Sequence, residues 1–337
     1  MKVSELGEFG LIELLAEITG GSQVNRIASW QQLVIGIGDD AAVWHTPTST
    51  QLTTVDSFIE GVHFPSGIDT WWELGWKALA VNLSDIAAMG GLPRYALVSL
   101  AVPGVTEVDD ITALFQGMNE LAQQFGVAII GGDTSHAPLV IINITVLGSA
   151  RHPDKPVLTR ATAMPGDKIA VTGYLGTAAA GLEMLTKNLP VDVETTASLK
   201  QAFLKPYPRL KEGQLLVELG VKTAIDISDG LISDLQHICK ASQVSARIEV
   251  DRVPIPSAVR TNFENRSLEL ALSGGEDYEL LFMADNDIME KVKTVASCPI
   301  TVIGEIETGK ADEIILVDGK WNPVSLPKSG WEHFTAR

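Results

Sequence analysis

The hydrophobic pattern along this chain changes repeatedly between strand-like apolar runs and apolar residues at helical spacing. The apolar runs predict strands at 33–43, 51–55, 95–102, 127–130, 139–147, 168–172, 223–227, 247–250, 278–283 and 301–303. Helical spacing predicts helices at 9–18, 72–89, 108–125, 177–186, 210–219 and 231–242. The uncharged strand at 95–102 is expected to be buried on both faces. The pattern predicts strands and helices in both halves of the chain.

The length and a change of composition indicate two domains. A chain of 337 residues is long enough for two units that each bury a core. Around 151–156 the sequence becomes polar and contains prolines, which is typical of a linker. We therefore predict one domain at 1–150 and a second at 151–337. There is no short repeat, but each half contains a strand that ends in Asp and leads to a helix.

Several aspartates occupy predicted strand ends or the interior of an apolar helix, where an unpaired carboxylate is costly. They are Asp39, Asp40, Asp56, Asp85, Asp133, Asp226 and Asp229. A single one could be a turn residue or a helix N-cap, and Asp229 could cap the helix at 231–242. Asp85 is harder to explain in this way, because its helix is otherwise largely apolar. Lys77, two turns upstream, is one candidate partner.

The recurrence of these acids favours a site for hard cations. Converging carboxylates need positive charge, and few Lys or Arg residues stand near them in the sequence. Mg²⁺ takes oxygen ligands and commonly bridges carboxylates to substrate phosphates. We therefore predict a nucleoside triphosphate held through Mg²⁺, with the backbone N–H groups of Gly131 and Gly132 and the cation of Arg160 as direct phosphate contacts.

Other motifs and partners fit less well. The segment 304–311 has P-loop spacing, but Ala311 replaces the Ser or Thr that ligates Mg²⁺, and its glutamates would repel phosphate, so we predict a hairpin turn. The sequence contains no Gly-x-Gly-x-x-Gly, His-Glu-x-x-His or Gly-x-Ser-x-Gly motif. The net charge of −17 and the pI near 4.7 argue against a nucleic-acid partner.

Cysteine usage and hydropathy favour a cytoplasmic protein without a membrane partner. The two cysteines, Cys239 and Cys298, are far apart and form no Cys-x-x-Cys motif, which fits a reducing compartment. The first eight residues lack the apolar core of a signal peptide. No apolar run reaches the roughly 18 residues needed to span a bilayer.

Six ordered sequence blocks resemble the thiamine-monophosphate kinase family. The blocks are Gly36-Ile37-Gly38-Asp39-Asp40-Ala41-Ala42, Glu60-Gly61-Val62-His63-Phe64, Lys77-Ala78-Leu79-Ala80-Val81-Asn82-Leu83-Ser84-Asp85, Gly131-Gly132-Asp133-Thr134, Ala224-Ile225-Asp226-Ile227-Ser228-Asp229-Gly230-Leu231 and Ser273-Gly274-Gly275-Glu276-Asp277-Tyr278-Glu279-Leu280. The resemblance extends from Gly7-Glu8-Phe9 to the aromatic residue near the C-terminus, essentially the whole chain.

The resemblance implies a fold, an activity and an assembly. The fold would be the two-domain aminoimidazole-ribonucleotide-synthetase type, with a mixed sheet and helices in the N-terminal domain and an α+β C-terminal domain. The N-terminal α/β domains would pair in a homodimer. The activity would be transfer of the ATP γ-phosphoryl group to thiamine monophosphate, giving thiamine diphosphate and ADP. Several Mg²⁺ ions would take part, and a K⁺ requirement is compatible with this picture.

The resemblance also implies roles for individual residues. The implied metal ligands are Asp40, Asp56, Asp85, Asp133, Asp226 and Asp229, with Thr54 and Val55 beside Asp56. The implied nucleotide contacts are Gly132, Asp133, Arg160 and Ser228, and the implied acceptor contacts are His63, Glu276 and Trp331. The family often has a second hydroxyl residue where this chain has Val55, so a metal contact there would use the Val55 backbone carbonyl.

The three implied acceptor contacts also have ordinary structural explanations. His63 lies between Val62 and Phe64 and could be a half-buried histidine without a ligand. Glu276 follows a glycine pair and could be a turn residue, and Trp331 could pack the C-terminal segment against the body.

The acceptor chemistry predicts direct transfer. A phosphate monoester is largely dianionic at pH 7 and needs no general base, so we predict in-line transfer between metal-bound phosphates, without a phospho-enzyme or a single catalytic side chain. Two alternatives are an ATP-dependent synthetase that activates an amide or a selenide, and a non-catalytic cation-binding scaffold. A selenide enzyme would be expected to carry a reactive residue such as Cys near its N-terminus, and no Cys precedes Cys239.

Overall fold

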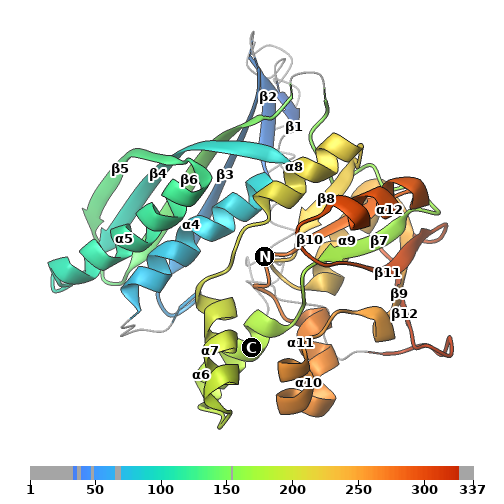
Figure 1. The fold of residues 1–337 in the computed structure, drawn as a ribbon. Coiled ribbons are helices and arrows are strands. Elements are labelled where there is room, and N and C mark those ends of the chain that lie inside the picture. Colours follow the sequence, from blue (N-terminus) through green and yellow to red (C-terminus); the bar gives the residue numbers. More distant parts are fainter. Residues whose placement is uncertain (1–32, 36–38, 47–48, 65–69, 153–154, 326–337) are drawn as a thin grey trace, which may run out of the picture.

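The computed structural model describes residues 33–35, 39–46, 49–64, 70–152 and 155–325 (Figure 1). The predicted helix at 9–18 and Trp331 lie outside these residues. The described residues form two six-stranded sheets, one in each half of the chain, and helices pack on both. The predicted fold class, a mixed sheet with helices in the N-terminal half and α+β structure in the C-terminal half, is confirmed. Among the described residues, no helix has the length and apolarity needed to cross a membrane.

The first sheet has the strand order β1-β2-β3-β6-β4-β5, and only its neighbours β4 and β5 run parallel. Its strands are β1 (Leu33–Ile35), β2 (Ala42–His45), β3 (Thr50–Ile59), β4 (Gly91–Val102), β5 (Ala128–His136) and β6 (Ile141–Ala150). Two helices, α4 (Trp71–Ala88) and α5 (Val108–Phe125), lie along one face of this sheet (Figure 1). The helix α5 ends where Gly126 adopts a left-handed conformation with φ 68°.

The second sheet has the order β12-β9-β11-β7-β10-β8, in which β12 and β9 run parallel and the other neighbours antiparallel. Its strands are β7 (Lys168–Thr172), β8 (Thr223–Asp226), β9 (Ser245–Glu249), β10 (Leu280–Ala284), β11 (Ile300–Glu307) and β12 (Ile314–Val317). The α-helices of this half are α6 (Thr177–Lys187), α7 (Val193–Leu204), α8 (Leu210–Leu219), α9 (Leu231–Ser242), α10 (Ser257–Phe263), α11 (Ser267–Ser273) and α12 (Asn286–Val295). Two 3-10 turns complete this half: η2 (Val250–Arg252) lies between β9 and α10, and η3 (Glu264–Arg266) lies between α10 and α11.

The helix α4 connects the two halves through a shared core. It is apolar on nearly all sides and contacts β3 and α5 of the first half as well as α8 and β8 of the second. Its Leu79 and Leu83 are fully buried in the same cluster as Leu216 and Phe282 from the second half. The polar residues Lys77, Asn82 and Ser84 of this helix are buried where the two halves meet.

Some predicted elements have different bounds in the structure. The segment predicted as one strand at 33–43 contains two antiparallel strands, with Leu33 opposite Trp44, so the chain reverses before β2. Asp56 and Asp133, predicted at strand ends, lie inside β3 and β5, because both strands continue for three further residues. The predicted hairpin at 304–311 is also wrong, since β11 and β12 pair with opposite sides of β9.

One face of the first sheet is open. The helices α4 and α5 cover the face that carries Leu52, Ile144 and Val98, whereas side chains on the other face are accessible. Tyr95 and Leu97 on β4 are 50% and 38% exposed. The prediction that strand 95–102 is buried on both faces is therefore wrong, because no described helix covers this second face.

Candidate active site

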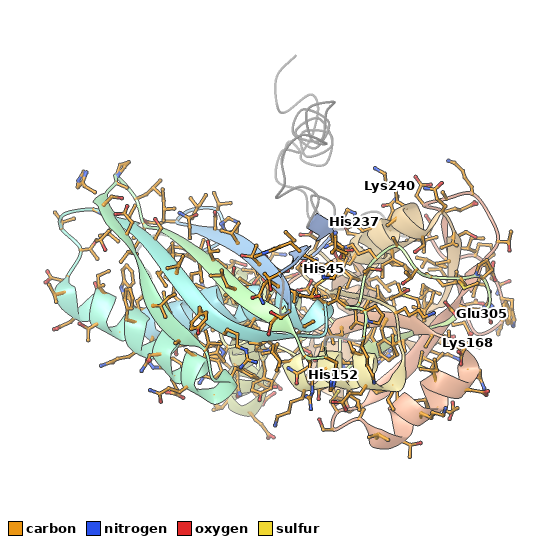
Figure 2. All side chains as sticks on the ribbon, turned by 90° about the horizontal axis from the view of Figure 1, so that it is seen from above. His45, His152, Lys168, His237, Lys240 and Glu305 are labelled. Atoms are coloured by element: carbon orange, nitrogen blue, oxygen red, sulfur yellow. The ribbon has the colours of Figure 1, made fainter. Side chains whose placement is uncertain are left out.

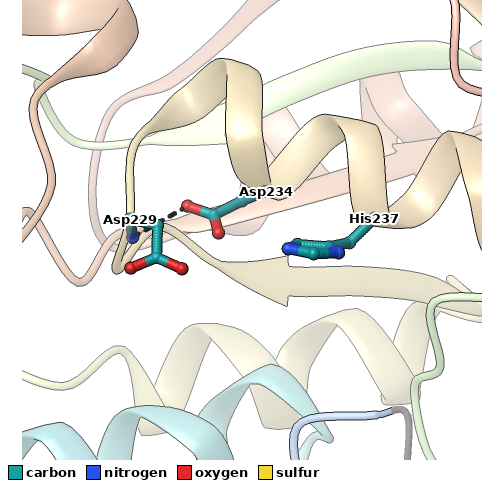
Figure 3. A group of neighbouring side chains, drawn as sticks. All are labelled: Asp229, Asp234 and His237. Atoms are coloured by element: carbon teal, nitrogen blue, oxygen red, sulfur yellow. Dashed lines mark hydrogen bonds between the residues drawn. The ribbon is translucent and has the colours of Figure 1, made fainter. Parts of the chain in front are cut away.

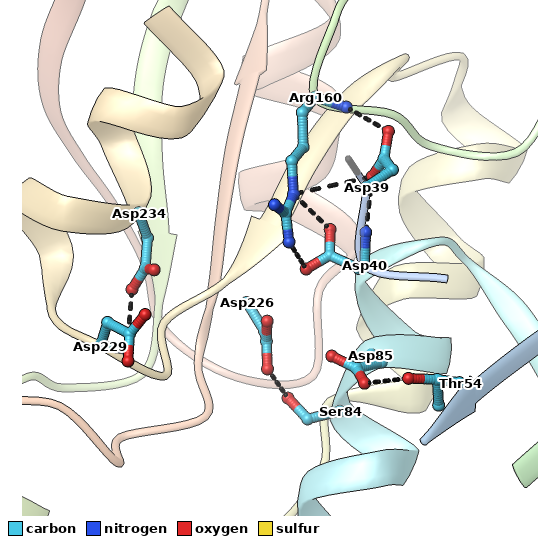
Figure 4. A network of polar contacts seen from close by, with 9 residues as sticks. All are labelled: Asp39, Asp40, Thr54, Ser84, Asp85, Arg160, Asp226, Asp229 and Asp234. Atoms are coloured by element: carbon cyan, nitrogen blue, oxygen red, sulfur yellow. Dashed lines mark hydrogen bonds and ion pairs between the residues drawn. The ribbon is translucent and has the colours of Figure 1, made fainter. Parts of the chain in front are cut away.

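Three carboxylates from distant parts of the chain meet beside α4. Asp40 lies two residues before β2, Asp85 lies near the end of α4, and Asp226 ends β8. One oxygen atom from each lies within 4.8 Å of those from the other two (Figure 4). Asp40 and Asp226 are buried, and Asp85 is half-buried. The predicted meeting of acids from both halves is present for these three residues.

Hydroxyl and amide groups fix the directions of the acids around α4. Ser84 Oγ donates a hydrogen bond of 2.6 Å to Asp226 Oδ2, which joins the two halves. Thr54 Oγ1 donates to Asp85 Oδ2 (Figure 4). The backbone N–H of Asp56 donates to the Asn82 side-chain carbonyl at 3.2 Å. Alternation along β3 directs Thr54 and Asp56 toward α4 and Val55 toward the open face, where Val55 is 61% exposed.

Burial, and after it the charge of neighbouring carboxylates, raises the pKa values of Asp85, Asp226 and Asp56. Burial raises the pKa of Asp85 well above its usual range, and the charges of Asp56, Asp226 and Asp40 add to this. Burial likewise raises the pKa of Asp226, followed by the charge of Asp40, and it raises the pKa of Asp56 to about 6. An added divalent cation would relieve this repulsion, and an all-oxygen donor set suits Mg²⁺. The residues therefore fit the predicted metal.

Arg160 supplies part of the counter-charge. Its Nε and Nη2 atoms donate to the two carboxylate oxygens of Asp40 at 3.1 and 2.6 Å, and its backbone N–H donates to Asp39 Oδ2 at 3.2 Å. Burial lowers the pKa of Arg160, but the charge and hydrogen bonds of Asp40 raise it further than burial lowers it. The expectation that few basic side chains stand near the acids holds along the sequence, but in space Arg160 reaches Asp40.

Lys77 has another partner than the one suggested by sequence. Its ammonium group forms an ion pair with Glu276 from the second half, and it lies 3.6 Å from the centroid of the Phe203 ring. The suggestion that Lys77 neutralises Asp85 is therefore wrong. The two lie two helical turns apart on α4, and Lys77 points to a different group of residues.

A second group of potential ligands lies at the start of α9. Asp229, Asp234 and His237 each offer a ligand atom, and these atoms lie within 4.8 Å of one another (Figure 3). Asp234 Oδ2 accepts hydrogen bonds from the backbone N–H groups of Asp229, at 3.3 Å, and Gly230, at 3.0 Å. Burial raises the pKa of Asp234 well above its usual range, and the charges of Asp229 and Asp226 add to this.

His237 lies on the side of α9 toward the first sheet (Figure 2). Burial lowers its pKa to about 4, and the nearby charge of Arg160 lowers it too, so its imidazole is neutral at pH 7. The ion pair between Lys168 and Glu305, 2.7 Å long, lies at the far side of the second half (Figure 2). The charged groups near His237 are Arg160 and Asp40 of the carboxylate site, and Lys240 on α9 itself.

Gly132 and Asp133 lie apart from the three carboxylates. Both are on β5, an edge strand of the first sheet. Asp133 is opposite Ser99, which is opposite Asn143, which is opposite Ser57 on β3. Three strand spacings, about 14 Å, therefore separate Asp133 from Ser57. Within one chain, the structure does not bring Asp133 to the site beside α4.

The candidate acceptor contacts have different surroundings. His63 is half-buried, its Nδ1 accepts the backbone N–H of Ile59 at 3.0 Å, and its ring stacks on Phe58 with a centroid distance of 5.6 Å. Glu276 pairs with Lys77, and its backbone N–H donates to the Ser228 carbonyl at 2.8 Å. Glu276 thus lies directly beside the segment that carries two other candidates, Asp226 and Ser228.

Sequence reasoning missed Asp234 and the pairing of Lys77. Asp234 stands four residues after Gly230, the residue that precedes α9, and this spacing is the signal that could have suggested a contact with the loop before the helix. The partner of Lys77 is 199 residues away in the chain, and no local sequence pattern predicts this contact.

Comparisons with known proteins agree with this architecture. Residues 38–150 match the family model of the AIR synthase related protein, N-terminal domain, and residues 164–317 match that of the AIR synthase related protein, C-terminal domain. Thiamine-monophosphate kinase of Bacillus subtilis is 38% identical, covering 89% of this chain and 93% of the relative. The same enzyme of Escherichia coli K12 is 37% identical, covering 97% and 98%. The solved structure of AaThiL complexed with AMPPCP and TMP has a TM-score of 0.85 and 29% identity, covering 99% of both chains. The chain therefore belongs to the thiamine-monophosphate kinase family.

Proposed function

We propose that this chain transfers the γ-phosphoryl group of ATP to thiamine monophosphate, giving thiamine diphosphate and ADP. Family membership supports the reaction, as does the AaThiL relative, which was solved with AMPPCP and TMP. The observation that carries the proposal in this chain is the meeting of Asp40, Asp85 and Asp226 from both halves. Such a cluster suits the transfer of a phosphoryl group between two anions.

The acidic residues of the site act by binding metal ions, which in turn position the phosphate groups. Asp40, Asp85 and Asp226 are the proposed metal ligands, together with Asp56 near Asp85 and Asp229 in the second group at the start of α9. Thr54 and the Val55 carbonyl complete the β3 side. Bound Mg²⁺ would lower the repulsion between the acceptor phosphate and the ATP γ-phosphate. Because the acceptor is already an anion, the chain needs no general base, and transfer is direct and in line.

Arg160 is the proposed direct contact to the nucleotide phosphates, together with Ser228, which lies two residues after β8. The guanidinium is paired with Asp40, and a metal ion on Asp40 would compete with it for the same carboxylate. Arg160 could then turn toward a phosphate, for which its planar fork is well suited. His63, Glu276 and Trp331 are the proposed contacts to the thiamine part of the acceptor. A K⁺ requirement and a cytoplasmic setting stay predictions.

We also propose a homodimer formed through the open face of the first sheet. Val55, Tyr95 and Leu97 give this face exposed apolar side chains, of the kind that marks a protein interface. A second copy would also explain how Asp133 can take part in the reaction, although it lies about 14 Å from Ser57 within one chain. The Gly132–Asp133 segment of one copy would then serve the carboxylate site of the other.

Mixing two inactive variants tests the homodimer and the role of Asp133 together. Asp133→Asn and Asp226→Asn are each expected to be nearly inactive. If Asp133 acts across the interface, refolding the two variants together restores activity, because some sites then combine an intact Asp133 from one copy with an intact Asp226 from the other. Mixtures that stay inactive, or a monomeric mass by light scattering, would count against this assembly.

Release of ADP that depends on thiamine monophosphate tests the function itself. The assay supplies ATP and Mg²⁺ and measures ADP and thiamine diphosphate with and without the acceptor. Equal amounts of ADP and thiamine diphosphate are expected. A synthetase would release ADP only with another acceptor, and a non-catalytic scaffold would release none, so either result would reject the proposal.

A further inference from the structure

The ion pair between Lys77 and Glu276 is placed where a packing role alone does not explain it. Lys77 lies in the middle of α4, and its side chain is only 4% exposed. Burying an ammonium group is costly even when it is paired, and an apolar side chain of the same length would pack at this position without that cost. The pair links the first half to the second through a residue that the proposed function already uses.

The backbone around Glu276 is held in an unusual conformation. Glu276 and Tyr278 have φ values of 72° and 49°, which non-glycine residues rarely adopt. Their N–H groups donate to the carbonyls of Ser228, at 2.8 Å, and Ile227, at 2.9 Å. The loop is thereby laid along the segment that carries Asp226 and Ser228, and local strain of this kind is common at functional sites.

The two charges of the pair differ in their access to solvent. The Glu276 side chain is 26% exposed, whereas that of Lys77 is 4% exposed. The Lys77 ammonium contacts the carboxylate and also lies over the ring of Phe203, which is itself buried. A ligand can therefore approach Glu276 from outside while Lys77 holds the carboxylate from within.

We propose that Lys77 is a positioning residue, which holds the Glu276 carboxylate in the direction needed to meet the cationic thiamine part of the acceptor. The inference rests on the proposed function, in which Glu276 contacts the acceptor. Lys77 does not itself touch the acceptor or the reacting phosphates. Its loss should weaken acceptor binding without changing nucleotide binding or the transfer step, because Asp85 lies two turns farther along α4.

A double-mutant cycle tests this inference, with KM for thiamine monophosphate, KM for ATP and kcat measured for each variant. Lys77→Met and Glu276→Gln should each raise KM for thiamine monophosphate about tenfold and leave the other two constants within about twofold. The double variant should be no worse than either single one, because the two residues act through one contact. Lys205→Met is the matched control. Lys205 also lies over aromatic rings, at 4.2 Å from Trp72 and 4.5 Å from Trp76, and its loss should change none of the three constants.

The outcomes separate the inference from the function on which it rests. If Glu276→Gln raises KM for the acceptor and Lys77→Met does not, or if the two effects multiply, the inference is overturned while the proposed function stands. If Glu276→Gln changes none of the three constants, Glu276 does not contact the acceptor, and the inference about Lys77 is rejected as well. Should Lys77→Met fail to fold, Phe203→Leu keeps the lysine but removes the ring beneath it. That variant should raise KM for the acceptor about threefold, and an unchanged KM would reject the inference.

Discussion

Two buried acids at the same end of the second sheet differ in how their charge is balanced. Glu279 precedes β10, and Asp226 ends the neighbouring strand β8, opposite Leu280. The guanidinium of Arg209 donates two hydrogen bonds to the Glu279 carboxylate, at 2.6 and 2.5 Å. Asp226 faces the carboxylates of Asp40 and Asp85 instead, and burial raises its pKa, followed by the charge of Asp40.

The difference indicates two roles: Glu279 stabilises the fold through its own ion pair, whereas Asp226 lies in a group of acids that an added cation would stabilise. Glu279 has its own cation, so its surroundings are complete without a ligand. Asp226 receives a hydroxyl hydrogen bond and shares the charge of Arg160 with Asp40, which leaves the cluster negative. A buried acid of this protein can be neutralised by a dedicated cation, as Glu279 is by Arg209. At Asp226 the chain instead keeps a repulsion between acids that lowers the stability of the fold.

The largest expected effect concerns Glu279. Glu279→Gln leaves the Arg209 guanidinium without its carboxylate in a mostly buried position, and it should lower the free energy of unfolding by about 3–5 kcal/mol. The Mg²⁺ dependence of the remaining activity should not change. Urea unfolding and an Mg²⁺ titration measure the two quantities. The double variant with Arg209→Met should recover part of the stability, and an altered Mg²⁺ requirement would contradict the structural role.

Asp226→Asn should give the opposite result. We expect kcat to fall about 100-fold and the Mg²⁺ concentration for half-maximal activity to rise, because a ligand is removed from the metal cluster. Stability without metal should stay the same or increase, since one repelling charge is gone. The matched control is Glu290→Gln, an exposed acid on α12. Unchanged activity across the Mg²⁺ titration would remove Asp226 from the cluster.

Local chemistry made a large part of this site predictable. The helices α8 and α9 have the bounds that apolar spacing predicts. Asp85 could be suspected because a charge inside an apolar helix has no local explanation, and Asp226 because an acid recurs at a predicted strand end. In both cases the unfavourable placement of one residue in its own segment was the signal.

Pairing over long sequence distances was not predictable in the same way. Arg160 and Asp40 are 120 residues apart, and only the packing of the two halves brings them together. The open face of the first sheet was missed for a related reason. The strand at 95–102 has no charged residue, and composition alone does not distinguish a face covered by helices from a face left for a partner.

Asp277 offers a third way of holding an acid, intermediate between Glu279 and Asp226. Its carboxylate accepts the backbone N–H groups of Gly176, at 2.7 Å, and Ala178, at 3.2 Å, at the start of α6. Burial nevertheless raises its pKa to about 7. The folded chain therefore binds a proton that the unfolded chain releases near pH 4, so this contribution to stability is present at low pH and is lost as the pH rises toward 7.

Asp277→Asn should remove this pH dependence. Between pH 4.5 and 7.5, the unfolding free energy of the unmodified chain should fall relative to that of the variant by about 2 kcal/mol, a reduced value because the Asp277 side chain is partly exposed. Urea unfolding at both pH values measures the difference. If the unfolding free energies of the unmodified chain and of the variant change with pH in the same way, the backbone N–H groups keep Asp277 ionised in the folded chain. Asp277 would then be a neutralised acid like Glu279.

The smallest expected effect tests whether α4 sets the direction of Asp226. Ser84→Ala removes the 2.6 Å hydrogen bond between the halves and should lower stability by about 1 kcal/mol. It should also raise the Mg²⁺ requirement about threefold, because the carboxylate loses the group that orients it. Ser267→Ala is the matched control, since Ser267 is a buried serine whose hydroxyl donates to the Glu264 carbonyl. It should lose similar stability with no change in the Mg²⁺ requirement. If the two variants behave alike, the Ser84 hydroxyl contributes to packing only, and the contrast between Asp226 and Glu279 rests on the carboxylates and Arg160 alone.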